Sequence, residues 1–245
     1  MQPREIKKGI YWVGGIDWSL RDFHGYLTQL GTTYNAYLII DDKITLVDTV
    51  KHYLVHEMLE RISQIIDPKK IDYIVSNHVE MDHSGGLPRL KELIPKAKIY
   101  TSPNGKKGLA LHYQKDWDFF EVKTGDVLNI GKRNLNFVQV PMVHWPDSMV
   151  TYVSEEKLLL SNDAFGQHIA GSERFDDEIN LGILMQQATK YYANIVMPFG
   201  AQVLKALDVV GALDLDMIAP SHGIIWCKNI PQILYKYKQW AANHT

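Results

Sequence analysis

The chain has 245 residues, of which 46% are hydrophobic and 22% charged, and its formal net charge is −2. This composition is typical of a globular protein with a sizeable core, and one domain over residues 1–245 is the simplest expectation. The near-neutral charge argues against a nucleic-acid or anionic-membrane partner, and the single cysteine excludes an intramolecular disulfide and a cysteine-ligated iron–sulfur centre.

The order of apolar residues predicts a mixture of strands and helices. Extended runs are expected at residues 10–14, 34–40, 44–48, 71–76 and 127–140, the second and third forming a hairpin and the last broken at Gly131-Lys132. Helices are expected from Leu54 to Ile66, ended by Asp67-Pro68, and from Ile230 to Trp240, with Asn229 as N-cap. Hairpins dominate over regular βαβ alternation, so we expect an α+β fold in which a sandwich of sheets carries helices on its outside.

Two further expectations concern location. The residues after Met1 include no apolar run of the kind that a secretory signal needs, and no stretch approaches the length of a membrane span. A cytoplasmic protein is therefore expected.

The chemistry is concentrated just after the predicted strand at 71–76. Two imidazoles and two carboxylates fall within six positions, at His78, Glu80, Asp82 and His83. If these four groups were buried without a cation, they would repel one another or stay unpaired. Their crowding therefore indicates a metal site. One metal cannot easily take all four from so short a segment, whereas two neighbouring metals can. If the segment is extended, its alternate residues face one way, so that His78, Glu80 and Asp82 converge and His83 turns to an adjacent point.

Three more residues of metal-ligand type each follow a predicted strand. They are His144 after the strand at 136–140, Asp163 after 157–160 and His222 after 216–220. Alone, His144 or Asp163 would more readily be a hydrogen-bonded loop residue. Because strands can deliver side chains from distant parts of the sequence to one edge of a sheet, we expect these three to join the cluster.

The pattern His78-x-Glu80-x-Asp82-His83 resembles the motif of the metallo-β-lactamase superfamily. Glu80, where most members have histidine, is typical of its flavodiiron branch, the oxygen and nitric oxide reductases. Other segments also look like that family: Asp17-Trp18 and residues 21–26, 31–37, 144–149, 191–194 and 220–223. The resemblance implies an αββα metallo-β-lactamase-like sandwich with two iron ions per chain. It assigns His78, Glu80 and His144 to one ion and Asp82, His83 and His222 to the other, with Asp163 as the bridge.

The ligand types agree with iron, because oxygen-rich sites that also contain histidine suit redox iron better than zinc, although zinc can substitute. The resemblance further suggests His24 and one of Tyr191 and Tyr192 as pocket residues, and the sequence does not decide which tyrosine faces inward. Trp145 is expected to pack beside His144, and Cys227 to be a buried structural residue.

Several functions remain open at this stage. Flavodiiron reductases continue into a flavodoxin-like domain that holds FMN, and neither that domain nor an FMN site is expected in residues 1–245. The main interpretation is therefore a diiron protein that binds O2 as a peroxo adduct and acts as an oxygen or iron sensor, signalling to a partner such as a chemotaxis receptor–kinase complex. The alternative is an O2 or NO reductase domain or subunit that receives electrons from a separate flavodoxin or rubredoxin-type donor. A binuclear zinc hydrolase is a weaker alternative, because Glu80 argues against it. The family resemblance also implies a homodimer.

Overall fold

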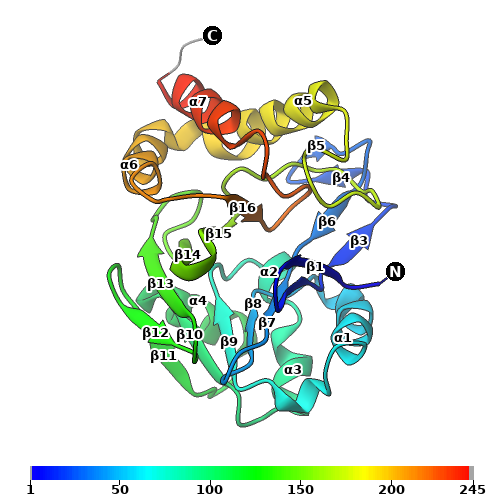
Figure 1. The fold of residues 1–245 in the computed structure, drawn as a ribbon, viewed down its shortest axis with the longest axis vertical. Helices are drawn as coiled ribbons and strands as arrows, with labels where there is room; N and C mark the ends of the chain where they lie inside the picture. The colour runs from blue at the N-terminus through cyan, green and yellow to red at the C-terminus, as the bar shows by residue number, and fades with distance from the viewer. Residues whose placement is uncertain (1, 243–245) are drawn as a thin grey trace.

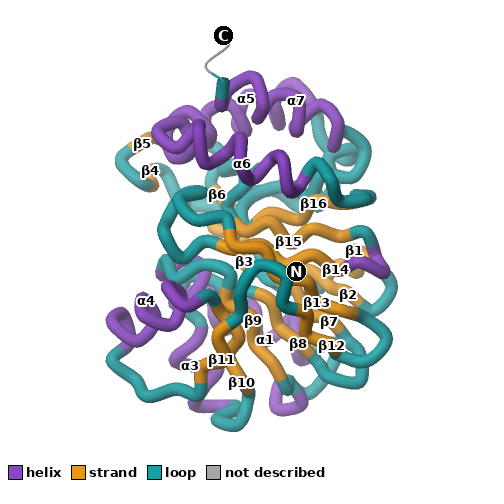
Figure 2. Tube along the Cα trace, turned by 90° about the vertical axis from the view of Figure 1, so that its left-hand side faces the viewer, coloured by secondary structure: helices purple, strands orange, loops and turns teal. Residues whose placement is uncertain are grey.

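A computed structural model describes residues 2–242 and shows two sheets packed face to face between two layers of helices (Figures 1 and 2). The seven-stranded sheet contains, in spatial order, β1 (Arg4–Lys7), β2 (Ile10–Trp12), β7 (Tyr37–Ile39), β8 (Thr45–Val47), β9 (Tyr73–Ser76), β10 (Lys98–Thr101) and β11 (Phe119–Glu121). The five-stranded sheet contains β12 (Val127–Asn129), β13 (Asn134–Gln139), β14 (Met149–Val153), β15 (Leu158–Asn162) and β16 (Met217–Pro220). Two small hairpin-like sheets pair β3 (Gly15–Asp17) with β6 (Thr32–Tyr34) and β4 (Asp22–Phe23) with β5 (Tyr26–Leu27).

Helices cover both outer faces. The seven-stranded sheet is covered by α1 (Val55–Ser63), α3 (Leu87–Leu93) and α4 (Pro103–Tyr113), and the five-stranded sheet by α5 (Leu181–Tyr191), α6 (Gly200–Val210) and α7 (Ile230–Ala241). The core between the sheets is built from inward-facing side chains of both, including Trp12, Ile39, Val47, Phe137 and Leu158. This is the αββα arrangement that the sequence predicts.

The hairpin of β7 and β8 is antiparallel, as expected, but the following segment is not built from hairpins. From β8 to β11 the strands pair in parallel and alternate with helices, which corrects the expectation that regular βαβ alternation is lacking. The reason is that β8 and most of β9 are buried on both faces, so their residues form continuous apolar runs that do not reveal the direction of pairing.

The C-terminal helix lies where the sequence places it, but Asn229 does not cap it through its side chain. Asn229 has φ −108° and ψ 25°, outside the extended conformation of an N-cap. Its backbone N–H and side-chain amide instead donate to Asp176 Oδ2, at 2.7 and 3.0 Å.

Residues 181–210 are long and apolar enough to resemble a membrane-spanning helix, so the expectation that no stretch approaches that length is wrong. In the structure this segment is divided into α5, a π-helix (Tyr192–Val196), a 3-10 turn (Met197–Phe199) and α6. Its buried residues, among them Leu184, Val196 and Val203, pack in the core cluster over the five-stranded sheet.

Candidate metal centre

The structure brings the seven predicted ligand residues together in two adjacent groups. Within each group the potential ligand atoms all lie within 4.8 Å of one another. The first group is His78, Glu80, His144 and Asp163, and the second is Asp82, His83 and His222. Every one of these residues except Glu80 and His144 is almost completely buried.

Asp163 lies between the two groups and turns one oxygen toward each. Its Oδ2 is 3.2 Å from His144 Nε2 and 3.6 Å from His78 Nε2. Its Oδ1 is 3.0 Å from His83 Nε2 and 3.5 Å from His222 Nε2. A carboxylate placed in this way can bind one ion through each oxygen.

The segment from His78 to His83 is extended only as far as Glu80. The short helix α2 (Met81–Ser84) begins at the next residue, so the expectation of an extended loop that groups Asp82 with His78 and Glu80 is wrong. The helical turn instead carries Asp82 and His83 together into the second group, where Asp82 Oδ2 is 3.3 Å from His83 Nε2 and 3.2 Å from His222 Nε2. Glu80 Oε2 remains in the first group, 3.3 Å from His78 Nε2. This grouping is the one that the family resemblance implies.

A buried carboxylate that the sequence analysis did not single out holds the strand ends together. Asp48, directly after β8, accepts hydrogen bonds from the backbone N–H and side-chain amide of Asn77, at 2.7 and 3.1 Å, and from Asn162 Nδ2 at 3.3 Å. Burial raises the pKa of Asp48. Asn162 adopts φ 52°, a left-handed conformation that asparagine tolerates, at a register shift in β15, and so turns the chain into Asp163.

Two of the histidines are oriented by partners on the ring nitrogen that faces away from the metal groups. Asp147 Oδ2 lies 2.9 Å from His78 Nδ1 and also accepts from Val79 N at 2.8 Å. The backbone oxygen of Thr33 lies 2.8 Å from His222 Nδ1. Such partners fix the ring and leave Nε2 free to bind an ion. In the sequence, Asp147 was marked only by its place in segment 144–149, one of those that resemble the flavodiiron family.

The charges of the site match a need for cations. Burial acts to lower the pKa of His83, but Asp82 and Asp163 raise it to about 9. The pKa of His144 is likewise about 9, because Asp163 and Glu80 outweigh burial. Burial would raise the pKa of Glu80, yet His144 and His78 lower it to about 2. Neighbouring histidines likewise outweigh burial and lower the pKa of Asp82 and of Asp163, so the carboxylates of the site are ionised and attract positive charge.

Several buried polar atoms of the site have no hydrogen-bond partner within residues 2–242. They are both carboxylate oxygens of Asp82, both ring nitrogens of His83 and Asp163 Oδ1. Buried polar groups without a partner are costly. A metal ion bound by imidazole nitrogens and carboxylate oxygens would satisfy these atoms. The residues present therefore fit a pair of metal ions.

The expected pocket residues fall on two sides of the ligands. His24, at the β4–β5 turn, places Nε2 3.3 Å from Glu80 Oε1. Tyr191 faces the site, with its ring centre 5.9 Å from that of His222. Tyr192 does not: its ring packs against those of Tyr237 and Trp240, so its inclusion as a site residue is wrong. Consecutive residues of a helix point in directions about 100° apart, so only one of the two tyrosines can face inward.

Trp145 and His168 complete the surroundings. The Trp145 ring centre lies 5.3 Å from that of His78 and 6.3 Å from that of His144, as expected of a wall residue. His168, which the sequence analysis missed, lies 4.8 Å from His222 between ring centres. Burial holds its pKa well below the usual value, so the ring is neutral. A single histidine in an irregular segment carries no sequence signal that would have revealed it.

Within residues 2–242, three side chains of the site are partly exposed. The side chains of His24, Glu80 and His144 are 28%, 17% and 10% exposed, whereas those of the other ligand residues are at most 2% exposed. A small molecule can therefore reach the ligands from the side of Glu80 and His24.

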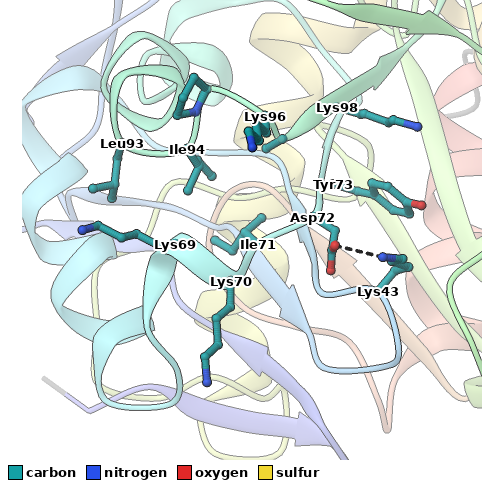
Figure 3. Close-up of a pocket in the computed structure, with 12 residues that line it drawn as sticks. Lys43, Lys69, Lys70, Ile71, Asp72, Tyr73, Leu93, Ile94, Lys96 and Lys98 are labelled. Carbon is teal, nitrogen blue, oxygen red and sulfur yellow. Dashed lines mark hydrogen bonds and ion pairs between the residues drawn. The ribbon is translucent and has the colours of Figure 1, made fainter.

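Two other polar clusters lack the properties of this centre. A hollow of about 650 Å³ lies at the N-terminal ends of β9 and β10, at Tyr73 and Lys98, and is bordered by five lysines (Figure 3). The metal ligands, in contrast, follow the C-terminal end of β9. Its one carboxylate, Asp72, is paired with Lys43 at 3.1 Å. Asp176, Asp177 and Cys227 also lie together, but Asp176 is occupied by backbone N–H groups of residues 227–229. Cys227 is only partly buried, so the expectation of a buried residue is wrong. Desolvation and the Asp176 carboxylate nevertheless raise the pKa of its thiol to about 12, which agrees with a structural role.

A two-metal ligand set at one edge of an αββα sandwich defines the class of metallo-β-lactamase-like proteins. The model of the ODP family of β-lactamases matches residues 32–223, and this chain belongs to that family. The metallo-β-lactamase-like fold predicted from the sequence is thereby confirmed.

Related sequences agree with this family assignment. Over 98% of its own length, the chain is 51% identical to a nitric oxide reductase of Moorella thermoacetica. It is 50% identical to a rubredoxin-oxygen oxidoreductase of Megalodesulfovibrio gigas over 92% of its own length. It is 56% identical to an uncharacterized protein of Methanocaldococcus jannaschii over 98% of its own length. It spans only 61%, 57% and 61% of those proteins, respectively.

Solved structures show the same relationship. Rubredoxin oxygen:oxidoreductase from Desulfovibrio gigas superposes with a TM-score of 0.96 at 47% identity, covering 98% of this chain and 62% of that one. The flavodiiron protein from Giardia intestinalis gives a TM-score of 0.96 at 38% identity, covering 99% and 60%. Apart from the uncharacterized protein, these relatives are named as reductases or as a flavodiiron protein. They confirm the flavodiiron resemblance and favour the reductase alternative over the sensor interpretation of the sequence.

Proposed function

We propose that this chain is the diiron domain of an O2 or NO reductase. The observation that carries the proposal is the pair of ligand groups joined by Asp163, with the carboxylate of Glu80 in the group that faces the open side. His78, Glu80 and His144 would hold one iron and Asp82, His83 and His222 the other. Glu80 makes the set richer in oxygen than an all-histidine site, which favours iron over zinc.

A pair of ferrous ions would supply two electrons to O2 or NO. The residues of the chain would bind that gas and control its surroundings. His24 is 3.3 Å from Glu80 on the open side, where its ring can donate to a small polar ligand or to Glu80 itself. Phe23, whose ring centre lies 6.0 Å from that of His222, and Trp145 form apolar walls that limit water near the ligands.

Reduction of O2 to water takes four electrons, two more than a pair of ferrous ions holds. We therefore propose an electron donor of flavodoxin or rubredoxin type. It would approach the side of Glu80 and His24, because the other ligand side chains, apart from the partly exposed His144, are buried. The names of the relatives support this choice of donor. A homodimer remains part of the proposal.

The test is anaerobic reconstitution with ferrous iron, elemental analysis, and gas consumption with a reduced flavoprotein and rubredoxin as electron source. We expect two irons per chain and sustained consumption of NO or O2 that depends on the donor. Glu80→Ala should lose this turnover. The control Glu92→Ala removes an exposed carboxylate of α3 and should keep the turnover. Reversible O2 binding without turnover in the presence of the donor would overturn the reductase proposal in favour of a sensor. Uptake of a single iron at saturation would overturn the two-metal site.

A further inference from the structure

A small apolar cavity lies between α6 and the segments that carry two of the metal ligands. Its volume is about 20 Å³. The inner wall includes Val143, which precedes His144, and Ala164 and Phe165, which follow Asp163. The outer wall comes from α6, where the helix covers the five-stranded sheet (Figures 1 and 2), and consists of Val203, Ala206, Leu207 and Val210.

The lining is unsuited to water. Apart from the Tyr237 phenol, every lining side chain is a hydrocarbon, and the Tyr237 oxygen already accepts a hydrogen bond from Phe165 N at 2.7 Å. A buried water needs about two to four polar partners, so this cavity would stay dry. Cavities lined by such residues bind apolar molecules instead.

The size selects a very small occupant. A volume of ~10–15 Å³ is the least that admits one water-sized molecule, so this cavity suits a single very small apolar molecule or atom. O2 and NO are both nearly apolar and of this size. Most of the wall is buried, but Ala206 and Leu207 are partly exposed, so the α6 side is the least buried part of the wall.

We propose that this cavity is a docking site for one molecule of O2 or NO, separated from the metal ligands only by the backbone at 143–144 and 163–165. The identity of the gas rests on the proposed reductase function, whereas the affinity for apolar gases rests on the cavity alone. A gas held here is concentrated beside the two segments that present His144 and Asp163 to the metals.

Xenon tests the proposal, because it reports apolar cavities without any turnover. Crystals of the chain loaded with zinc are placed under xenon pressure and the density between α6 and the residues 140–165 is measured. We expect a xenon atom in contact with Val203 and Val143. Val203→Phe, which fills the cavity from α6, should lose the xenon, and Val203→Ala, which enlarges it, should gain occupancy.

Val209→Phe is the matched control, since Val209 lies on the same helix but is 43% exposed and does not line the cavity. It should bind xenon as the parent does. If Val203→Phe fails to fold, Val203→Leu serves the same purpose with a smaller change.

No xenon in the parent, or equal occupancy in the parent and the filled variant, would overturn the docking site and leave the reductase proposal standing. Xenon in the cavity of a protein that fails to consume O2 or NO would overturn the reductase proposal and leave the apolar gas site supported.

Discussion

Replacing Asp147 by alanine should weaken metal binding without touching a ligand. Asp147 is only 4% exposed, and its Oδ2 lies 2.9 Å from His78 Nδ1 and 2.8 Å from Val79 N. The substitution leaves both donors buried and without an acceptor, and it frees the His78 ring to rotate. The first ligand group should therefore suffer more than the second.

The expected magnitudes follow from these contacts. A buried donor without a partner costs ~1–3 kcal/mol, so two such donors should lower the free energy of unfolding of the metal-free protein by ~2–6 kcal/mol. Loss of the partner of a metal-binding histidine typically weakens metal affinity ~10–100-fold, which corresponds to ~1.4–2.7 kcal/mol.

The assay is anaerobic titration with ferrous iron in competition with a chelator, alongside denaturant unfolding of the metal-free protein. Asp147→Asn keeps an acceptor oxygen and should lose less of both quantities. Asp176→Ala is a control for stability alone, because Asp176 binds backbone N–H groups of residues 227–229 and no metal ligand. Two irons bound with the affinity of the parent in Asp147→Ala would refute the orienting role of Asp147.

Further outcomes can be checked directly. Asp163→Ala should lose both metals together, because the two oxygens of Asp163 face different ligand groups. Glu80→Ala should mainly weaken one site. Elemental analysis after dialysis measures both, and two tightly held irons in Asp163→Ala would contradict the bridge. Burial would raise the pKa of Asp176, but hydrogen bonds from Cys227, Lys228 and Asn229 lower it below the usual 3.8. The ionised carboxylate of Asp176 therefore stabilises the fold above pH 3.8, and this stabilisation is lost as the pH falls through the lowered pKa. Asp176→Asn should accordingly show a weaker fall in stability between about pH 4 and 3 in urea unfolding, and a fall as steep as that of the parent would contradict the assignment. Light scattering at micromolar concentration should give the mass of a dimer, and a monomer alone would end that expectation.

The ligand residues were accessible to sequence analysis because each carries its own chemical signature. His78, Glu80, Asp82 and His83 crowd into six positions, and His144, Asp163 and His222 each follow an apolar strand. Strand ends converge at the edge of a sheet, so local patterns alone place the seven near one another. The sandwich class follows from the same runs, together with the family resemblance of the motif.

The spacing of the ligands did not decide how they divide or what surrounds them; the division was implied only by the family resemblance, and the tertiary structure shows its physical cause. The helical turn of α2 puts Asp82 in the group of His83 and not in that of His78, because the dihedral angles of residues 81–84 depend on what they pack against. Parallel pairing from β8 to β11 was hidden for a related reason, since strands buried on both faces lose the alternation that reveals direction.

The supporting residues were invisible in the sequence because their partners lie far along the chain. His78 and Asp147 are separated by 69 positions, Asp48 and Asn162 by 114, and His222 and Thr33 by 189. The choice of Tyr191 over Tyr192 likewise depends on how α5 is rotated against the five-stranded sheet and α7. The sequence determined the kinds of atom that can bind metal, and the packing of two sheets and their helices determined which atom faces which ion.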